Sequence, residues 1–178
     1  PDVILWNASF FAKPALDGKK TPWHQDGQYW PMRPLKTCTV WIAVDAATSE
    51  NGCMRFLPGS HKDQQLRQHR SHGNPDFTIR QELLESEYDE SNAFDVVLDE
   101  GQISMHDVYL LHGSEANYSK FPRRALTLRY MPATSLFDRN KARELYEKSG
   151  VFDNSESTIF LMSGTNQVAE NDFRIRSL

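Results

Sequence analysis

The residues best suited to chemistry lie in one short stretch, Trp23 to Trp30 (WHQDGQYW). It places the imidazole of His24 two residues before the carboxylate of Asp26. In an extended segment, this spacing sends both side chains to one face, where both can reach the same ion. Two imidazoles and one carboxylate form the facial triad that holds non-heme Fe(II) and leaves positions open for other ligands. The stretch therefore predicts two iron ligands, and a second histidine must come from elsewhere.

The third ligand has to be chosen among five further histidines: His61, His69, His72, His106 and His112. The first three lie in a turn or a polar loop, as exposed histidines usually do. His106 lies within the apolar run 103–111 and His112 directly at its end. The run predicts a strand, in which the two histidines would share a face about 20 Å apart. One ion cannot bind both. We favour His112, because Gly113 after it allows a close backbone approach.

An arginine follows at the start of the next predicted strand, in Pro122-Arg123-Arg124. A dicarboxylate co-substrate beside iron needs a planar, bidentate cation at its far end, and arginine supplies that geometry. Strand alternation separates two faces: Arg123, Ala125, Thr127 and Arg129 on one, and Arg124, Leu126, Leu128 and Tyr130 on the other. The smaller, more polar face suits the lining of a wet cavity. We therefore expect Arg123 to point inward and Arg124 to lie at the surface.

The elements that must position these residues are mostly short strands. We expect strands at 3–13, 37–44, 53–57, 93–98, 102–112 and 124–130, a hairpin turn at 49–52, and a short helix at 140–148. Little helix and no strand-helix alternation predict a mainly-β fold, a double-stranded β-helix (jelly roll, cupin-like) with a few peripheral helices. The polar region 61–91, with a possible helix at 79–88, is long enough to be a substrate loop or lid.

Composition narrows the class of protein. The chain has 178 residues, which predicts a single domain over 1–178, with 39% hydrophobic and 25% charged residues. Its formal net charge of -4 disfavours nucleic acid as a partner. No apolar run approaches a membrane span, and the first residues do not resemble a signal peptide. Cys38 and Cys53 have no metal-type spacing, so we expect reduced thiols in a cytoplasmic protein.

Three segments closely resemble the phytanoyl-CoA dioxygenase-like group of Fe(II)/2-oxoglutarate oxygenases, which includes ectoine hydroxylase: WHQDGQYWP, NGCMRFLPGSHK and LHGSEANYSKFPRRALTLRYMP. The resemblance implies iron ligation by His24, Asp26 and His112. It also implies that Arg123, eleven residues after the distal histidine, binds the remote carboxylate of 2-oxoglutarate. Other positions implied by the family are Ser114, Asn7 and Trp41 for the co-substrate, and Gln28, Tyr29 and Trp30 for the substrate mouth.

The resemblance further implies a dioxygenase that uses Fe(II), 2-oxoglutarate and O2 to hydroxylate an unactivated carbon of a small molecule, releasing succinate and CO2. Related halogenases replace the carboxylate ligand with a small residue, so the presence of Asp26 favours hydroxylation. Two alternatives stay open: another cupin-type zinc or iron enzyme, and an inactive binding member of the fold. Family members usually carry helices before the first strand, and this sequence shows none. Neither substrate nor oligomeric state is predicted.

Overall fold

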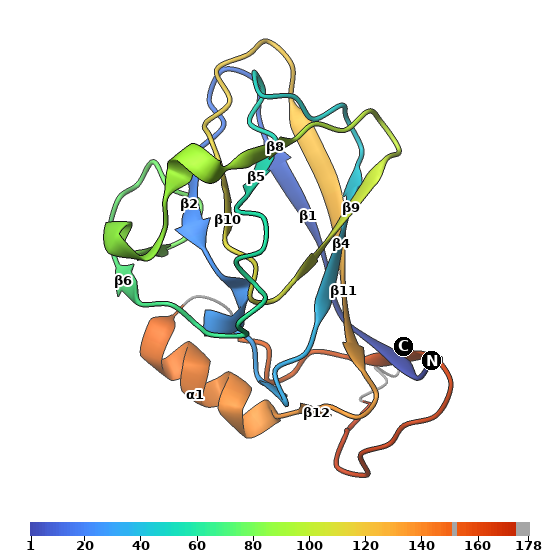
Figure 1. The fold of residues 1–178 in the computed structure, drawn as a ribbon. Helices are drawn as coiled ribbons and strands as arrows, with labels where there is room; N and C mark the ends of the chain where they lie inside the picture. The colour runs from blue at the N-terminus through green and yellow to red at the C-terminus, as the bar shows by residue number, and fades with distance from the viewer. Residues whose placement is uncertain (151–152, 174–178) are drawn as a thin grey trace.

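The computed structural model describes residues 1–150 and 153–173. Two antiparallel sheets dominate these ranges (Figure 1). The larger sheet has the order β13 (Phe160–Ser163), β1 (Val3–Lys13), β11 (Arg123–Pro132), β4 (Cys38–Ala43) and β9 (Ile103–Asp107). The smaller sheet has the order β2 (Thr21–His24), β10 (His112–Ser114), β5 (Met54–Phe56) and β8 (Phe94–Val96). The predicted mainly-β architecture is confirmed.

Shorter elements surround the two sheets. Two small ribbons pair β12 (Leu136–Phe137) with β3 (Met32–Arg33), and β6 (His69–Ser71) with β7 (Gln81–Leu83). The helices are η1 (Asp26–Gln28), η2 (Glu85–Glu87), η3 (Glu90–Asn92) and α1 (Arg139–Ser149). None of these helices is both long and apolar enough to span a bilayer.

The predicted helix at 140–148 is confirmed as α1, and its ends explain why it forms. The Asp138 side chain accepts a hydrogen bond from the Lys141 backbone N–H, which caps the first turn. Gly150 ends the helix with a φ of 63°, a left-handed conformation that suits glycine. The possible helix at 79–88 was wrong, because that segment forms β7 and then η2.

Two predicted strand connections were also wrong. The run 102–112 is not one strand: β9 ends at Asp107 in the larger sheet, and β10 begins at His112 in the smaller one. Likewise, β5 does not return beside β4, because β4 pairs with β11 and β9 whereas β5 pairs with β10 and β8. In both places the chain crosses between layers, which local turn signals cannot distinguish from a hairpin.

The two faces of the larger sheet differ as the alternation in β11 predicts. Arg123, Ala125 and Thr127 are buried, whereas Arg124 is exposed. On the outer face, apolar side chains remain accessible, including Phe10 (74%), Ile103 (53%) and Met105 (60%). The inner face turns toward the smaller sheet, and a cavity of about 190 Å³ is lined by residues from both sheets.

Candidate metal centre

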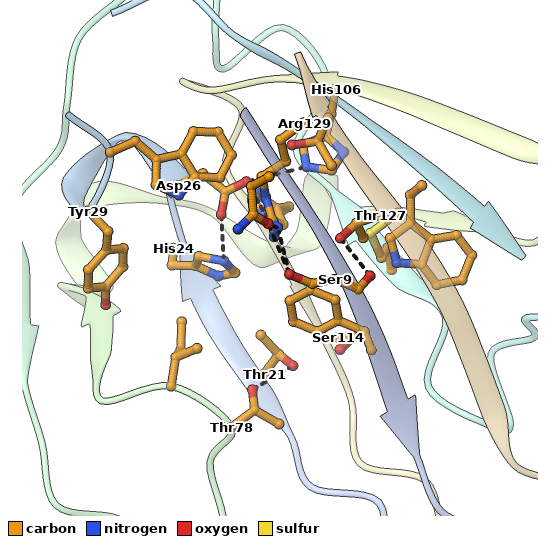
Figure 2. A pocket seen from close by; sticks show the side chains of 18 of the residues that line it. Ser9, Thr21, His24, Asp26, Tyr29, Thr78, His106, Ser114, Thr127 and Arg129 are labelled. Carbon is orange, nitrogen blue, oxygen red and sulfur yellow. Dashed lines mark hydrogen bonds and ion pairs between the residues drawn. The ribbon is translucent and has the colours of Figure 1, made fainter. Parts of the chain in front are cut away.

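Three side chains converge on one point of this cavity. His24 on β2 and His112 on β10 are direct cross-strand partners, and their ring centroids lie 4.1 Å apart. Asp26, the first residue of η1, lies two residues after the end of β2 (Figure 2). One ligand atom from each of the three residues lies within 4.8 Å of the other two. These are the residues predicted as iron ligands, although Asp26 approaches through a turn rather than through strand alternation.

Backbone carbonyls fix how the two histidines face the centre. Nδ1 of His24 donates to the Pro22 carbonyl at 2.9 Å, and Nδ1 of His112 donates to the Leu110 carbonyl at 2.9 Å. With the proton on Nδ1, each ring has its lone pair on Nε2. The Nε2 atom of His24 lies 3.7 Å from Oδ1 of Asp26, and that of His112 lies 4.0 Å from Oδ2. Such outer hydrogen bonds orient metal-binding imidazoles in known sites. The donor set therefore fits a divalent metal.

The electrostatic environment favours the protonation states that a metal requires. Burial lowers the pKa of His112 well below its usual value, and His24 adds to this effect, so the imidazole stays neutral. Burial alone would raise the pKa of Asp26, but interactions with His106 and His24 hold it well below its usual range. A neutral imidazole and an ionised carboxylate are the forms that bind metals.

Close packing supports this arrangement at Gly113. A Cβ there would lie 3.0 Å from the Thr21 carbonyl oxygen and 3.3 Å from the Trp23 backbone nitrogen. Because these are backbone atoms of β2, they cannot move aside without displacing His24. The predicted close approach at Gly113 is confirmed.

His106 is a site residue that the sequence reasoning missed. Because β9 and β10 belong to different sheets, its ring centroid lies 4.7 Å from that of His112, not about 20 Å away. Its Nε2 lies 3.6 Å from Oδ2 of Asp26. Unlike the other two histidines, it has no carbonyl partner at Nδ1, which is buried without a hydrogen bond. This geometry suits an Nε2–H that orients the Asp26 carboxylate.

We expect His106→Phe to weaken binding of Mn(II), a non-oxidising substitute for Fe(II), by about 10–100-fold, as for other losses of outer hydrogen bonds. The ring would retain the packing against Phe56 while losing the polar contact with Asp26. Calorimetric titration measures the effect, and His106→Gln should recover part of it. Equal affinity in the wild type and both variants would contradict an orienting role.

The arginine end of the cavity lies near Trp41 and Gly52. The Arg123 side chain is 4% exposed, its Nε donates to the Gly52 carbonyl at 3.1 Å, and its Cζ lies 5.4 Å from the centre of the Trp41 ring. Burial lowers the pKa of Arg123 to about 10, so it stays charged at neutral pH. Arg123 forms no ion pair with a carboxylate in the described ranges. Its charge is thus free for an anionic ligand.

Lys13 on β1 is the register partner of Arg123 on β11, and its burial should make the stability of the fold depend on pH. The side chain is 2% exposed, and burial, reinforced by Arg123, lowers its pKa from 10.5 to about 7. The unfolded chain therefore binds more protons than the folded chain between these two values, and stability rises with pH across that window. From pH 7 to 9, the wild type should gain about 2 kcal/mol relative to Lys13→Met.

Urea denaturation of both proteins at pH 7 and pH 9 measures this difference. The comparison with Lys13→Met removes the contributions of other groups that titrate in the same range. Parallel pH dependence in the two proteins would show that Lys13 keeps its ordinary pKa.

Residues in the first two thirds of the region 61–91 are hydrogen-bonded to β2 and to Gln25, which follows it. The buried Gln25 donates from Nε2 to the carbonyls of Gln65 (2.9 Å) and Tyr109 (2.7 Å), and its backbone N–H donates to His69 at 3.1 Å. Farther along, Thr78 donates to the Thr21 hydroxyl at 2.9 Å (Figure 2). Thr78 and Ile79 both line the cavity. A substrate-loop role for 61–91 remains a prediction.

The remaining predicted residues fall into two groups. Six of them line the cavity with the metal ligands: Asn7, Tyr29, Trp30, Trp41, Ser114 and Arg123. The exception is Gln28, whose side-chain amide donates to the Arg67 carbonyl at 3.2 Å and which is not among the lining residues. Burial raises the pKa of Tyr29, and its hydroxyl is buried without a hydrogen bond in the described structure. Their roles toward ligands remain predictions.

Known proteins resemble this chain in sequence. A family profile described as phytanoyl-CoA dioxygenase (PhyH) matches residues 3–125. The chain is 34% identical over 138 residues to a phytanoyl-CoA dioxygenase domain-containing protein 1 homolog of Caenorhabditis briggsae, covering 74% of this chain and 46% of the relative. It is 33% identical over 138 residues to a probable alpha-ketoglutarate-dependent hypophosphite dioxygenase of Stutzerimonas stutzeri, with 74% and 46% covered. The chain thus spans about half the length of these relatives.

Solved structures agree with the sequence comparison. The apo form of the non-heme monooxygenase ThoJ superposes with a TM-score of 0.65 at 31% identity, covering 76% of this chain and 48% of ThoJ. EvdO2 from Micromonospora carbonacea var. aurantiaca, complexed with 2-oxoglutarate, gives a TM-score of 0.58 at 30% identity, covering 70% and 52%. The predicted double-stranded β-helix is confirmed. The profile match and these relatives show that the chain belongs to the phytanoyl-CoA dioxygenase family.

Proposed function

We propose that the protein is an Fe(II)/2-oxoglutarate-dependent dioxygenase that hydroxylates an unactivated carbon of a small-molecule substrate, with release of succinate and CO2. One observation carries this proposal. His24, Asp26 and His112 direct metal-binding atoms at one point, in the same cavity as a buried Arg123 that lacks a carboxylate partner. A zinc hydrolase would use the three metal ligands, but its reaction requires no buried arginine to bind a dicarboxylate co-substrate. The combination supports a metal site with a dicarboxylate co-substrate.

Each part of the site has a distinct task in this proposal. His24, Asp26 and His112 would hold Fe(II), and His106 would orient the Asp26 carboxylate. Bound iron supplies the activation of O2 that couples decarboxylation of 2-oxoglutarate to oxidation of a carbon–hydrogen bond.

The co-substrate would lie toward β11. Arg123 would bind its remote carboxylate through N–H groups not used by Gly52, and Ser114, which is 5% exposed and lines the cavity, would add a hydroxyl donor. Trp41 would hold the guanidinium in place through its ring face. These contacts preorganise the anion site before the co-substrate arrives, which lowers the entropic cost of binding.

The substrate would enter beside Tyr29, Trp30 and the loop residues Thr78 and Ile79, all of which line the same cavity. Aromatic rings and a few polar groups at a cavity mouth are typical of small-molecule sites. Hydrogen bonds between Gln25 and the backbone of Gln65 and Arg67 hold the loop in place, so it would exclude water from the cavity. We retain the predicted cytoplasmic location as part of the proposal.

Anaerobic addition of Fe(II) and then 2-oxoglutarate tests the proposal. We expect a weak visible charge-transfer band that requires both additions, and succinate release once oxygen is admitted. A protein that binds metal without developing this band would instead belong with the other cupin-type metalloenzymes. A protein that binds neither would be an inactive member of the fold.

A further inference from the structure

A row of polar side chains crosses the inner face of the larger sheet at one level. Strand register aligns Asn7 on β1 with Arg129 on β11, Arg129 with Thr39 on β4, and Thr39 with His106 on β9. All four residues line the cavity. Neighbouring members of such a row have Cβ atoms about 4.5–5.5 Å apart. We call Asn7, Arg129, Thr39 and His106 the polar row.

Three atoms of the polar row lack a hydrogen-bond partner although they are buried. They are Nε of Arg129, Oγ1 of Thr39 and Nδ1 of His106. Nη1 of Arg129 donates to Oδ1 of Asn7 at 2.6 Å, and the guanidinium carbon lies 5.5 Å and 5.2 Å from the centres of the Phe11 and Trp30 rings. Buried polar atoms usually have partners, so three exceptions on neighbouring strands that line one cavity need an explanation, which a bound ligand would supply.

The charge of Arg129 is also unmatched. Seven other arginines pair with carboxylates: Arg33, Arg55, Arg67, Arg70, Arg124, Arg139 and Arg143. Arg129 makes no such ion pair in the described ranges. Burial also lowers its pKa, because the folded protein disfavours its charge. Asp26 opposes this lowering electrostatically, but the proposed function assigns its carboxylate to the metal. A buried cation without a counter-ion is costly, and an incoming anion removes that cost.

The two arginines of the cavity serve different ends of it. Arg123 and Arg129 lie six residues apart on β11, about 20 Å along the strand. Figure 2 shows Arg129 beside His106 and Asp26, away from Ser114, Thr21 and Thr78. A five-carbon dicarboxylate is much shorter than this separation, so one held by the metal and Arg123 would leave Arg129 unpaired. Asn7, predicted above for the co-substrate, hydrogen-bonds Arg129 and is here assigned to the polar row instead.

Formal charges indicate the class of ligand. Asp26 is the sole acidic residue among the described residues that line the cavity. In the proposed complex, the two positive charges of Fe(II) and the one of Arg123 are matched by Asp26 and the two negative charges of 2-oxoglutarate. The charge of Arg129 is left over, and one negative charge from the substrate would neutralise it.

We propose that the polar row binds a carboxylate of the substrate, so that the enzyme oxidises a small carboxylic acid held by Arg129 and Thr39. This inference rests on the proposed function, because the metal and co-substrate define which anion sites remain. In-plane N–H groups of a guanidinium match the two oxygens of a carboxylate. The Thr39 hydroxyl, 2% exposed, lies beside Arg129 in register and can donate a second contact. Trp30 and Phe11 would flank the apolar part of the ligand.

Calorimetric titration of benzoate into the full chain, saturated with Mn(II) and 2-oxoglutarate, tests this inference. Filling the metal and Arg123 sites first leaves the polar row as the anion site. Arg129→Met should weaken benzoate binding by at least about 30-fold, and Thr39→Val by about 2–10-fold. Arg124→Met, on the exposed side of the same strand, should leave it unchanged. Benzamide, which is neutral, should bind more weakly than benzoate.

The outcomes separate this inference from the proposed function. If 2-oxoglutarate binds the wild type but benzoate does not, or binds Arg129→Met and wild type equally, the polar row is not the carboxylate site. Tighter binding of phenyl phosphate than of benzoate would replace the carboxylate with a phosphate. Loss of 2-oxoglutarate binding in Arg129→Met, with retention in Arg123→Met, would make Arg129 the co-substrate residue. Failure of 2-oxoglutarate to bind the wild type would overturn the proposed function itself.

Discussion

Replacing His112 with alanine is expected to weaken binding of a divalent metal by at least about 100-fold, because loss of an outer contact alone already costs about 10–100-fold. The substitution removes one of the three atoms that meet within 4.8 Å and leaves His24 and Asp26 without their partner. The charge-transfer band with Fe(II) and 2-oxoglutarate should disappear. Titration of Mn(II), followed by calorimetry, measures the metal affinity directly.

His61→Ala is the matched control for this variant. His61 is another histidine, five residues after the end of β5, but it is not among the residues that line the cavity. Its replacement should leave metal affinity within about twofold of the wild type, as expected for a substitution outside the site. Circular dichroism checks that His112→Ala keeps the fold. If a folded His112→Ala protein binds metal normally, the proposed ligand set is wrong.

Replacing Arg123 with methionine is expected to weaken binding of 2-oxoglutarate by at least about 30-fold, the loss that follows when one partner of a buried charge pair is truncated. Metal affinity should change little, because Arg123 is not part of the ligand set. Arg123→Lys should fall between the two proteins, since a lysine keeps the charge but not the planar donor geometry. Titration of 2-oxoglutarate into the Mn(II) protein measures all three.

The same substitution has a second, opposite consequence for stability. Burial lowers the pKa of Arg123 to about 10, which is the mark of a charge that the folded protein disfavours. Without 2-oxoglutarate, Arg123→Met should therefore melt at a higher temperature than the wild type. With saturating 2-oxoglutarate, the order should reverse, because the ligand stabilises only the protein that binds it.

Arg124→Met controls both measurements. Arg124 is exposed, and its Nη2 lies 2.7 Å from Oδ1 of Asp45, so its removal should change stability little and leave co-substrate binding unchanged. A loss of 2-oxoglutarate affinity in Arg124→Met, but not in Arg123→Met, would show that strand alternation was assigned to the wrong face.

Some features of the fold were readable from local sequence because short-range physics determines them. The apolar and aromatic segment 3–13 is β1 with the predicted bounds, and the capped segment at 140–148 is the core of α1. Alternation along β11 correctly distinguished the buried Arg123 from the exposed Arg124. The prediction failed where the chain passes from one sheet to the other, as between β9 and β10, because the apolar pattern there continues as if it were one strand.

The sequence by itself determined the donor types of the candidate site, because an imidazole and a carboxylate two residues apart, a later histidine and an arginine at a strand start are local facts. Only the tertiary structure decided that His106 joins them. Its distance from His112 depends on β9 and β10 belonging to opposite sheets. The same holds for the polar row, since register between four strands brings Asn7, Arg129, Thr39 and His106 together. Strand pairing is a long-range outcome that no short segment encodes alone.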